Sequence, residues 1–360
     1  MNRLHNFSAG PAALPLSALQ RAQREFIDFG HGASILETSH RSSTWLDEQE
    51  LATGRLRNLL KVPETHAIVW LQGGASHQFA MLPMNFLPPD KTAAYVVTGT
   101  WAEKGLAEAQ RVGNAIEAAS AAPGGYRDIP DPTTWNVPDN AAYLHLTSNN
   151  TIYGTQFHDF PARGDVPLVC DMSSDILSRP VDVDQFDLIY AGAQKNLGPA
   201  GATLAIVRKS WLENARDDIP VILRYATHVA KDSAYNTPPV FAIYMVGCVL
   251  EWIDEQGGLE PIIQANARKA ARLYGLFDRH PDFYKGHAAI RARSSMNITF
   301  NLPSSELESE FLAAAAEQGL SGLKGHRSVG GIRASTYNAI PEESVEALAQ
   351  FMEHFLSTRG

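Results

Sequence analysis

The sequence predicts an α/β fold in which a mostly parallel sheet carries helices on both sides and a smaller α/β domain follows. Short apolar runs alternate with helical stretches between residues 66 and 208. These runs are rich in β-branched and aromatic residues and lack period-two alternation, which is typical of strands buried on both faces. A second strand–helix series follows residue 280. Strands that alternate with helices in this way form sheets covered by helical layers.

The elements of the larger part are predicted in chain order. The opening NFSAGPAALP is punctuated by Gly and Pro, which indicates an irregular arm. Apolar periodicity predicts helices over 16–28 and 45–60, and we expect the arm and these helices to pack with the C-terminal domain. Further helices begin near residues 76 and 101, and the predicted strands are 66–71, 93–98, 141–146, 166–171, 187–192 and 203–208.

The C-terminal third is predicted to begin with helices over 239–280. A strand at 296–303, a helix at 304–318, a strand at 331–336 and a helix at 341–356 follow. The expected organisation is therefore an arm of residues 1–15, a large domain of residues 16–255 and a small domain of residues 256–360.

Composition bounds the function. The 360 residues are 44% hydrophobic with a net charge of −9, so we expect no nucleic-acid or membrane partner, both of which call for a basic surface. No signal core and no apolar run of about 18 residues occurs. Cys170 and Cys248 lie in apolar stretches, which predicts buried thiols rather than disulfides. Without zinc-type Cys/His spacing either, we expect no metal and a cytoplasmic protein.

Polar segments follow five of the predicted strands. Ligands of open α/β sheets bind outside the carboxyl ends of the strands, so these segments are expected to converge. They are QGGASHQ, GTWAEKG, TSNNTIYG, DMSSDILSRP and AQKNLGPAG.

Each of these signals alone has an ordinary structural interpretation. The Gly-rich turn at 73–76 could be a tight strand–helix connection or a phosphate cradle at a helix N-terminus, and it lacks both GxGxxG and a Walker lysine. Asp171 could cap the next turn, although a carboxylate that ends a buried strand calls for a partner. Lys195 could be solvated, although an apolar run and a Gly/Pro turn hold its backbone.

The combination of Lys195 and Asp171 is more specific than either residue. A lysine that forms a Schiff base and an aspartate that pairs with a protonated pyridine nitrogen are the two groups that pyridoxal phosphate needs. Lys195 would also move a proton at the substrate Cα, and desolvation should lower its pKa for that role.

The chain resembles the phosphoserine aminotransferases, a class-V aminotransferase family within fold type I of the pyridoxal-phosphate enzymes. The resemblance runs nearly end to end and implies a seven-stranded main sheet. The matching segments are NFSAGP, SHR (39–41), GTW (99–101), CDMSSDILSRP, YAGAQKNLGPAG, NTPP (236–239) and LKGHRSVGGIRASTYNA (323–339).

The resemblance also implies cofactor contacts. Trp101 should stack on the pyridine ring and Thr151 should bond its 3′-oxygen or nearby polar atoms. The cofactor phosphate should be bound by Ala75, Ser76 and Gln194, and by Asn236 and Thr237 of a neighbouring subunit. The last contact implies a homodimer with shared sites. Some members have Gly-Arg in place of Ala75-Ser76, so backbone groups must carry more of the anchoring here. Some have Ser in place of Ala9, so a side-chain hydrogen bond from position 9 to substrate is not expected to carry over.

Substrate recognition is expected to use arginine and histidine. Arg333 lies in a predicted strand and needs an anionic partner, which fits a bidentate bond to an α-carboxylate. A His-Arg pair alone is usually surface decoration, but the resemblance implies that the substrate's distal anion is bound by His40, Arg41, His326 and Arg327.

The implied reaction is reversible transamination between glutamate and 3-phosphooxypyruvate, giving 2-oxoglutarate and O-phosphoserine. A longer phosphorylated hydroxy-oxo acid on the route to pyridoxine is a second possible substrate. An alanine–glyoxylate type of aminotransferase would not need the two His-Arg pairs, and a cysteine desulfurase needs a mobile nucleophilic Cys. A non-catalytic protein of this fold would not need Lys195 and Asp171.

Overall fold

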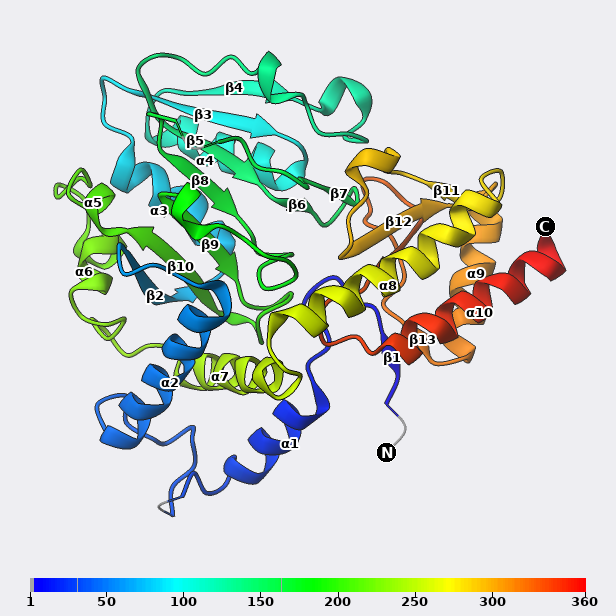
Figure 1. Ribbon diagram of the computed structural model, residues 1–360, viewed down its shortest axis with the longest axis horizontal. Coiled ribbons are helices and arrows are strands. Elements are labelled where there is room, and N and C mark those ends of the chain that lie inside the picture. Colours follow the sequence, from blue (N-terminus) through cyan, green and yellow to red (C-terminus); the bar gives the residue numbers. More distant parts are fainter. Residues whose placement is uncertain (1–2, 31, 163) are drawn as a thin grey trace.

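The computed structural model describes residues 3–30, 32–162 and 164–360. Its main sheet has seven strands in the order β2-β10-β9-β8-β5-β3-β4, which confirms the predicted sheet (Figure 1). Pairings from β4 through β9 are parallel, whereas β10 runs antiparallel to β9 and β2. The strands are β2 (His66–Gly73), β3 (Thr92–Val97), β4 (Ala115–Ser120), β5 (Ala141–Thr147), β8 (Leu168–Asp171), β9 (Leu188–Gly192) and β10 (Gly201–Arg208).

The central strands are buried on both faces, as their continuous apolar sequences predict. Every residue of β3, β5, β8 and β9 is buried. Alternate side chains enter two different cores: Val96 and Cys170 lie in one, and Tyr95 and Tyr190 in the other. Both cysteines are buried free thiols, as predicted.

Helices cover each face of the main sheet. The core that contains Tyr95 also includes residues of α3 (Ala75–Phe86) and α4 (Thr100–Val112). The other core includes residues of α1 (Leu16–Glu25), α2 (Ser43–Leu60) and α7 (Val240–Glu255). The expectation that the first helices pack with the C-terminal domain is therefore wrong. Arg21 of α1 instead pairs with Glu48 of α2 at 3.0 Å and with Glu251 of α7 at 2.6 Å.

The C-terminal part has its own small sheet and core (Figure 1). Strands β11 (Lys285–Gly286), β12 (Asn297–Asn301) and β14 (Ile332–Ser335) pair antiparallel. Its helices are α8 (Leu259–Arg279), α9 (Ser305–Glu317) and α10 (Glu342–Arg359), and its core includes Phe277, Phe300 and Phe311. In the arm, β1 (His5–Asn6) pairs with β13 (Leu320–Ser321), and Phe7 enters this core. The domain boundaries stay a prediction.

Short elements complete the chain. A hairpin of β6 (Asn149–Asn150) and β7 (Thr155–Gln156) follows β5, and α5 (Lys209–Leu212) and α6 (Tyr225–Val229) follow β10. Within the described ranges, no helix combines the length and the apolar character that crossing a bilayer requires.

Candidate active site

Side chains from four connections meet at the carboxyl ends of the central strands. Asp171 is the last residue of β8, and Lys195 lies in the turn that follows β9. Lys195 Nζ donates to Thr151 Oγ1 at 2.9 Å, and Thr151 lies in the β6–β7 turn. The same Nζ lies 5.1 Å from the centroid of the Trp101 ring, in the first turn of α4. The predicted convergence of these segments is thus observed.

Lys195 and Asp171 are electrostatically coupled. Burial lowers the pKa of Lys195 to about 8, and the negative charge of Asp171 opposes this shift. Burial raises the pKa of Asp171, and Lys195 opposes that shift in turn. The two side chains form no direct ion pair among the contacts of the described residues, so their coupling acts across intervening space.

The Asp171 carboxylate is oriented by its own turn. Its Oδ1 accepts from Ser173 N at 2.9 Å and from Ser173 Oγ at 2.6 Å. Gly192 N donates to the same serine hydroxyl at 3.0 Å, which ties the turn to the end of β9. Because both bonds go to Oδ1, the other oxygen remains able to accept from an N–H donor.

The N-terminus of α3 forms a backbone cradle beside this pair. Gly73, with φ +94, makes the turn into the helix in a conformation that favours glycine. Ala75 and Ser76 follow at the first helical positions, where backbone N–H groups are free and the helix dipole favours an anion. A Cβ on Gly192 would lie 3.3 Å from Ala75 N and 2.7 Å from Gln194 Oε1. Ala75 and Gln194, two of the predicted phosphate-binding residues, therefore both lie against the position that a Gly192 side chain would take.

Arg333 reaches the same site from the small sheet. Its Nη1 donates to the Thr151 carbonyl oxygen at 3.3 Å, while its buried Nε has no partner among the described residues. Burial lowers the pKa of Arg333. A half-buried guanidinium with an unused donor needs an anion to bind.

Three cations surround His326. Its pKa is lowered by burial and then by the charges of Arg333, Arg327 and Lys104. Lys104 also lies 4.8 Å from the centroid of the Trp101 ring. The acidic chain thus concentrates positive charge next to Lys195, where an anionic substrate would bind.

Four predicted residues lie apart from this constellation. His40 and Arg41 form the turn before α2, where Arg41 N donates to Ser39 Oγ at 3.3 Å. Asn236 and Thr237 precede α7, and the Thr237 carbonyl accepts from Gln72 at the end of β2. No described contact joins these four residues to Lys195.

Sequence reasoning overlooked three residues of the site. Lys104 is three positions after Trp101 on a helix, a spacing that places both on one face. Ser173 is two positions after Asp171, the usual place for a turn that bonds an aspartate. Tyr337, whose hydroxyl donates to the Ala9 carbonyl at 2.8 Å, gives no local signal because its partner is distant in sequence.

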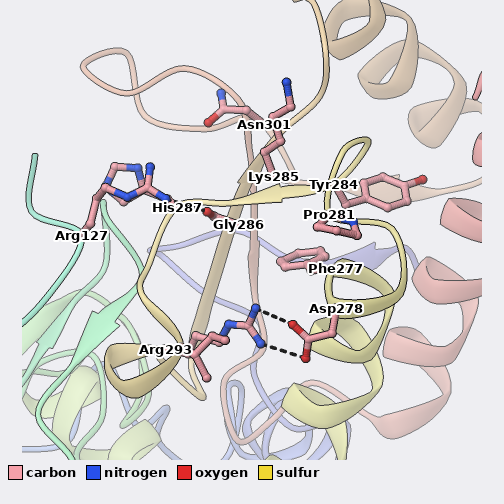
Figure 2. A pocket seen from close by; sticks show the side chains of 11 residues that line it. Arg127, Phe277, Asp278, Pro281, Tyr284, Lys285, Gly286, His287, Arg293 and Asn301 are labelled. Atoms are coloured by element: carbon pink, nitrogen blue, oxygen red, sulfur yellow. Dashed lines mark hydrogen bonds and ion pairs between the residues drawn. The ribbon is translucent and has the colours of Figure 1, made fainter.

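A cavity of about 790 Å³ beside β11 is separate from these residues (Figure 2). Arg293 pairs with Asp278 at 2.7 Å on one side of it, and Arg127 and His287 lie on another. None of the predicted site residues is among the described residues that line it. It therefore adds nothing to the constellation around Lys195.

Comparison with known proteins agrees with this geometry. Residues 4–348 match the aminotransferase class-V family. The phosphoserine aminotransferase of Niallia circulans is 55% identical over 359 residues, which cover 99% of both chains. The chain is therefore a member of the phosphoserine aminotransferases within the class-V family.

Two solved structures are similar over nearly the whole chain. That of phosphoserine aminotransferase from Bacillus circulans subsp. alkalophilus has a TM-score of 0.97 at 55% identity and covers 99% of each chain. That of pyridoxal-phosphate-bound phosphoserine aminotransferase from Trichomonas vaginalis has a TM-score of 0.92 at 40% identity and covers 98% of this chain and all of that one.

Proposed function

We propose that this protein catalyses reversible amino transfer between L-glutamate and 3-phosphooxypyruvate, forming O-phospho-L-serine and 2-oxoglutarate. The observation that carries the proposal is the coupled pair Lys195 and Asp171, which share one site beneath Trp101. The chain's membership of the phosphoserine aminotransferases supports the same reaction.

The residues fit pyridoxal phosphate as the resident cofactor. Asp171 keeps one carboxylate oxygen for a ring N–H, and Trp101 offers an aromatic face beside the lysine amine. Ala75 N and Gln194 converge beside Gly192, so they would hold the cofactor phosphate, with the Ser76 hydroxyl as a further donor. When bound, this cofactor supplies an aldehyde that accepts the amino group and a ring that withdraws electrons from Cα.

Lys195 acts as the covalent attachment point and as the group that moves a proton at the substrate Cα. Its pKa of about 8 makes the neutral amine accessible near neutral pH, which both tasks require. The Thr151 hydroxyl orients the amine and is available to bond the ring oxygen. Asp171 holds a proton on the ring nitrogen by remaining charged.

Arg333 binds the α-carboxylate that both amino acids share, because its guanidinium contacts Thr151 beside Lys195 and keeps one donor without a described partner. His326 and Arg327 bind the distal anion, together with His40 and Arg41. Phosphoserine presents about −1.5 to −2 charges there at neutral pH, whereas glutamate presents one. The positive cluster around His326 suits the phosphate.

The active form is proposed to be a cytoplasmic homodimer. Asn236 and Thr237 would contact the cofactor phosphate of the partner subunit, which accounts for their separation from Lys195 in one chain. The division into an arm of residues 1–15, a large domain of 16–255 and a small domain of 256–360 belongs to the same proposal. A second activity on 4-phosphooxythreonine, for pyridoxine biosynthesis, is also proposed, because the cluster recognises a phosphate rather than chain length.

Visible absorbance tests the reaction. The purified protein loaded with pyridoxal phosphate should be yellow, and its visible absorbance should fall when glutamate is added and return with 3-phosphooxypyruvate. A protein that does not respond to glutamate would contradict the proposal. Alanine should cause no change at matched concentration, because it lacks a distal anion.

A further inference from the structure

A buried lysine outside the site described above holds a stretch of backbone that adjoins the site. Lys269 of α8 is 2% exposed. Its Nζ donates to the carbonyl oxygens of Thr336 at 3.0 Å, Tyr337 at 2.8 Å and Ile340 at 3.1 Å. All three donors of the ammonium are therefore used on one segment, residues 336–340.

The 336–340 segment connects directly to the neighbour of Lys195. Asn338 N donates to Asn196 Oδ1 at 2.9 Å, and Asn338 Nδ2 donates to the Leu177 carbonyl at 2.9 Å. Asn196 Nδ2 in turn donates to the Ile176 carbonyl at 2.6 Å. Asn196 is thus held between the segment and the turn that follows Asp171.

The other end of the segment carries the substrate-binding strand. Arg333 belongs to β14, which ends at Ser335, immediately before Thr336. On α8, Asn266 donates to Asn338 Oδ1 at 2.8 Å, one turn before Lys269. One face of α8 therefore fixes both the exit of the Arg333 strand and the contact with Asn196.

A lysine is an expensive residue for a purely structural role here. Burial lowers the pKa of Lys269 to about 7, which reflects the unfavourable transfer of an ammonium from water. A methionine of similar length would avoid that penalty, but it would leave three carbonyl oxygens without their donor. The lysine therefore fixes the position of the 336–340 segment, because its hydrogen bonds all go to backbone atoms of that segment.

We propose that Lys269 is a positioning residue that keeps the amine of Lys195 in register with the guanidinium of Arg333. This inference rests on the proposed functions of Lys195 and Arg333. An amino acid held at its carboxylate by Arg333 presents its Cα to Lys195 only if the two groups keep a fixed separation. A misplacement of about 1 Å in such an arrangement can cost about 100-fold in rate.

The test compares Lys269→Met with Arg272→Met. Arg272 lies on the same helix and joins it to α10 through Glu346 at 2.7 Å and Glu353 at 2.9 Å, with no described contact to residues 336–340. In the cofactor-free protein, Lys269→Met should speed hydrogen–deuterium exchange of amides in residues 336–340 at least tenfold. Arg272→Met should leave their exchange unchanged.

Kinetics provide the second measurement. Lys269→Met should lower kcat/KM for glutamate and for phosphoserine by the same factor, about 10- to 100-fold, because both substrates use Lys195 and Arg333. Lys269→Gln, which keeps two donors, should recover part of that loss, and it serves as the test variant if the methionine variant does not fold.

Three results would overturn the inference. They are unchanged exchange in residues 336–340, a kcat/KM within twofold of wild type, and a loss in Arg272→Met equal to that in Lys269→Met. Failure of the proposed function is distinguishable, because wild-type protein would then not transfer amino groups at all while the exchange experiment would still report on the segment.

Discussion

Lys195 is half-buried and Lys269 is buried, and their neighbours give these two lysines different roles. Lys195 has one hydroxyl partner and an aromatic ring beside it, so its amine is free to react. Lys269 uses all its donors on backbone carbonyls, so its amine is fixed. Burial lowers the pKa of both side chains, to about 8 and about 7. A lowered pKa alone therefore does not identify the lysine proposed to be catalytic. What distinguishes Lys195 is that its amine is not fully occupied by hydrogen bonds to the protein.

The shifted pKa of Lys195 predicts a pH dependence of stability. Its pKa is about 8 in the folded chain and 10.5 ordinarily, so the unfolded chain binds more protons between these values. The burial cost is fully present below pH 8, and the free energy of unfolding should rise with pH up to about 10.5. Lys195→Met should lack that contribution, which is at most about 3 kcal/mol.

Denaturant unfolding of both cofactor-free proteins at a series of pH values, at one protein concentration, checks this prediction. The stability advantage of Lys195→Met should be largest below pH 8 and should vanish by about pH 10.5. Parallel curves for the two proteins would show that the lysine has no shifted pKa.

Arg333→Ala should weaken both amino acids. The side chain is half-buried with an unused donor, so losing it leaves the substrate carboxylate without its partner, at a cost of about 2–5 kcal/mol in kcat/KM. Separate half-reactions with glutamate and with phosphoserine, followed by absorbance, measure the loss. An effect confined to one substrate would rule out binding of the shared carboxylate.

Arg327→Ala should affect the two substrates unequally. Arg327 is one of the charges around His326, and a phosphate of about −2 interacts with that cluster more strongly than a single carboxylate. We expect the loss in kcat/KM to be at least tenfold greater for phosphoserine than for glutamate. If kcat/KM falls equally for the two substrates at low and at high salt, Arg327 does not bind the phosphate.

At the scale of elements, most strands of the main sheet could be predicted from sequence because burial on both faces makes them continuously apolar. Strand β4 was missed, since AIEAAS has only one branched residue and its other residues are Ala, Glu and Ser. It lies at the sheet edge, where less burial is required. The packing of α1 was wrongly assigned because apolar periodicity shows that a face is buried but not against which partner.

The site was predictable to the extent that its residues follow strands. Asp171 ends β8 and Lys195 follows β9, and these strands are parallel neighbours in the main sheet, so topology brings the two residues together. Tyr337 and Lys269 act through carbonyls and hydroxyls distant in sequence, and no motif encodes such contacts. The roles of Asn236 and Thr237 came from the resemblance alone, because one chain does not bring them to the site.

The last residue of β9 gives an element-scale prediction. Gly192→Ala should raise the dissociation constant of pyridoxal phosphate at least tenfold, because the added Cβ would enter the space between Ala75 N and Gln194 Oε1. Titration of the cofactor-free protein, followed by absorbance, measures it. Gly54→Ala is the control, since nothing lies within 4 Å of a Cβ there. An unchanged dissociation constant in Gly192→Ala would show that the cofactor phosphate does not bind beside Gly192.

At the scale of the whole molecule, this acidic protein has a cluster of positive side chains where two parts of the chain meet. The net charge is −9, yet Lys104 of the main sheet's helical layer and Arg333 of the C-terminal part both act electrostatically on His326. The N-terminal arm joins the same meeting point, since Tyr337 bonds the Ala9 carbonyl and Ala12 N donates to the Gln194 carbonyl at 2.9 Å. The substrate site therefore depends on the relative placement of both cores.

The proposed homodimer with shared sites makes a quantitative prediction for mixed subunits. Lys195→Ala should be folded and retain less than about 1% of turnover, since its role is chemical. A second variant, Asn236→Ala with Thr237→Ala, should bind the cofactor poorly in both of its sites. A heterodimer of the two variants has one site with an intact lysine from one subunit and intact Asn236 and Thr237 from the other. If subunits exchange randomly, half of the dimers are mixed and each has one working site, so activity should reach about a quarter of wild type.

The mixture is refolded together and compared with the two variants refolded separately and then combined. Activity that never exceeds the average of the separate variants would show that each subunit builds its site alone.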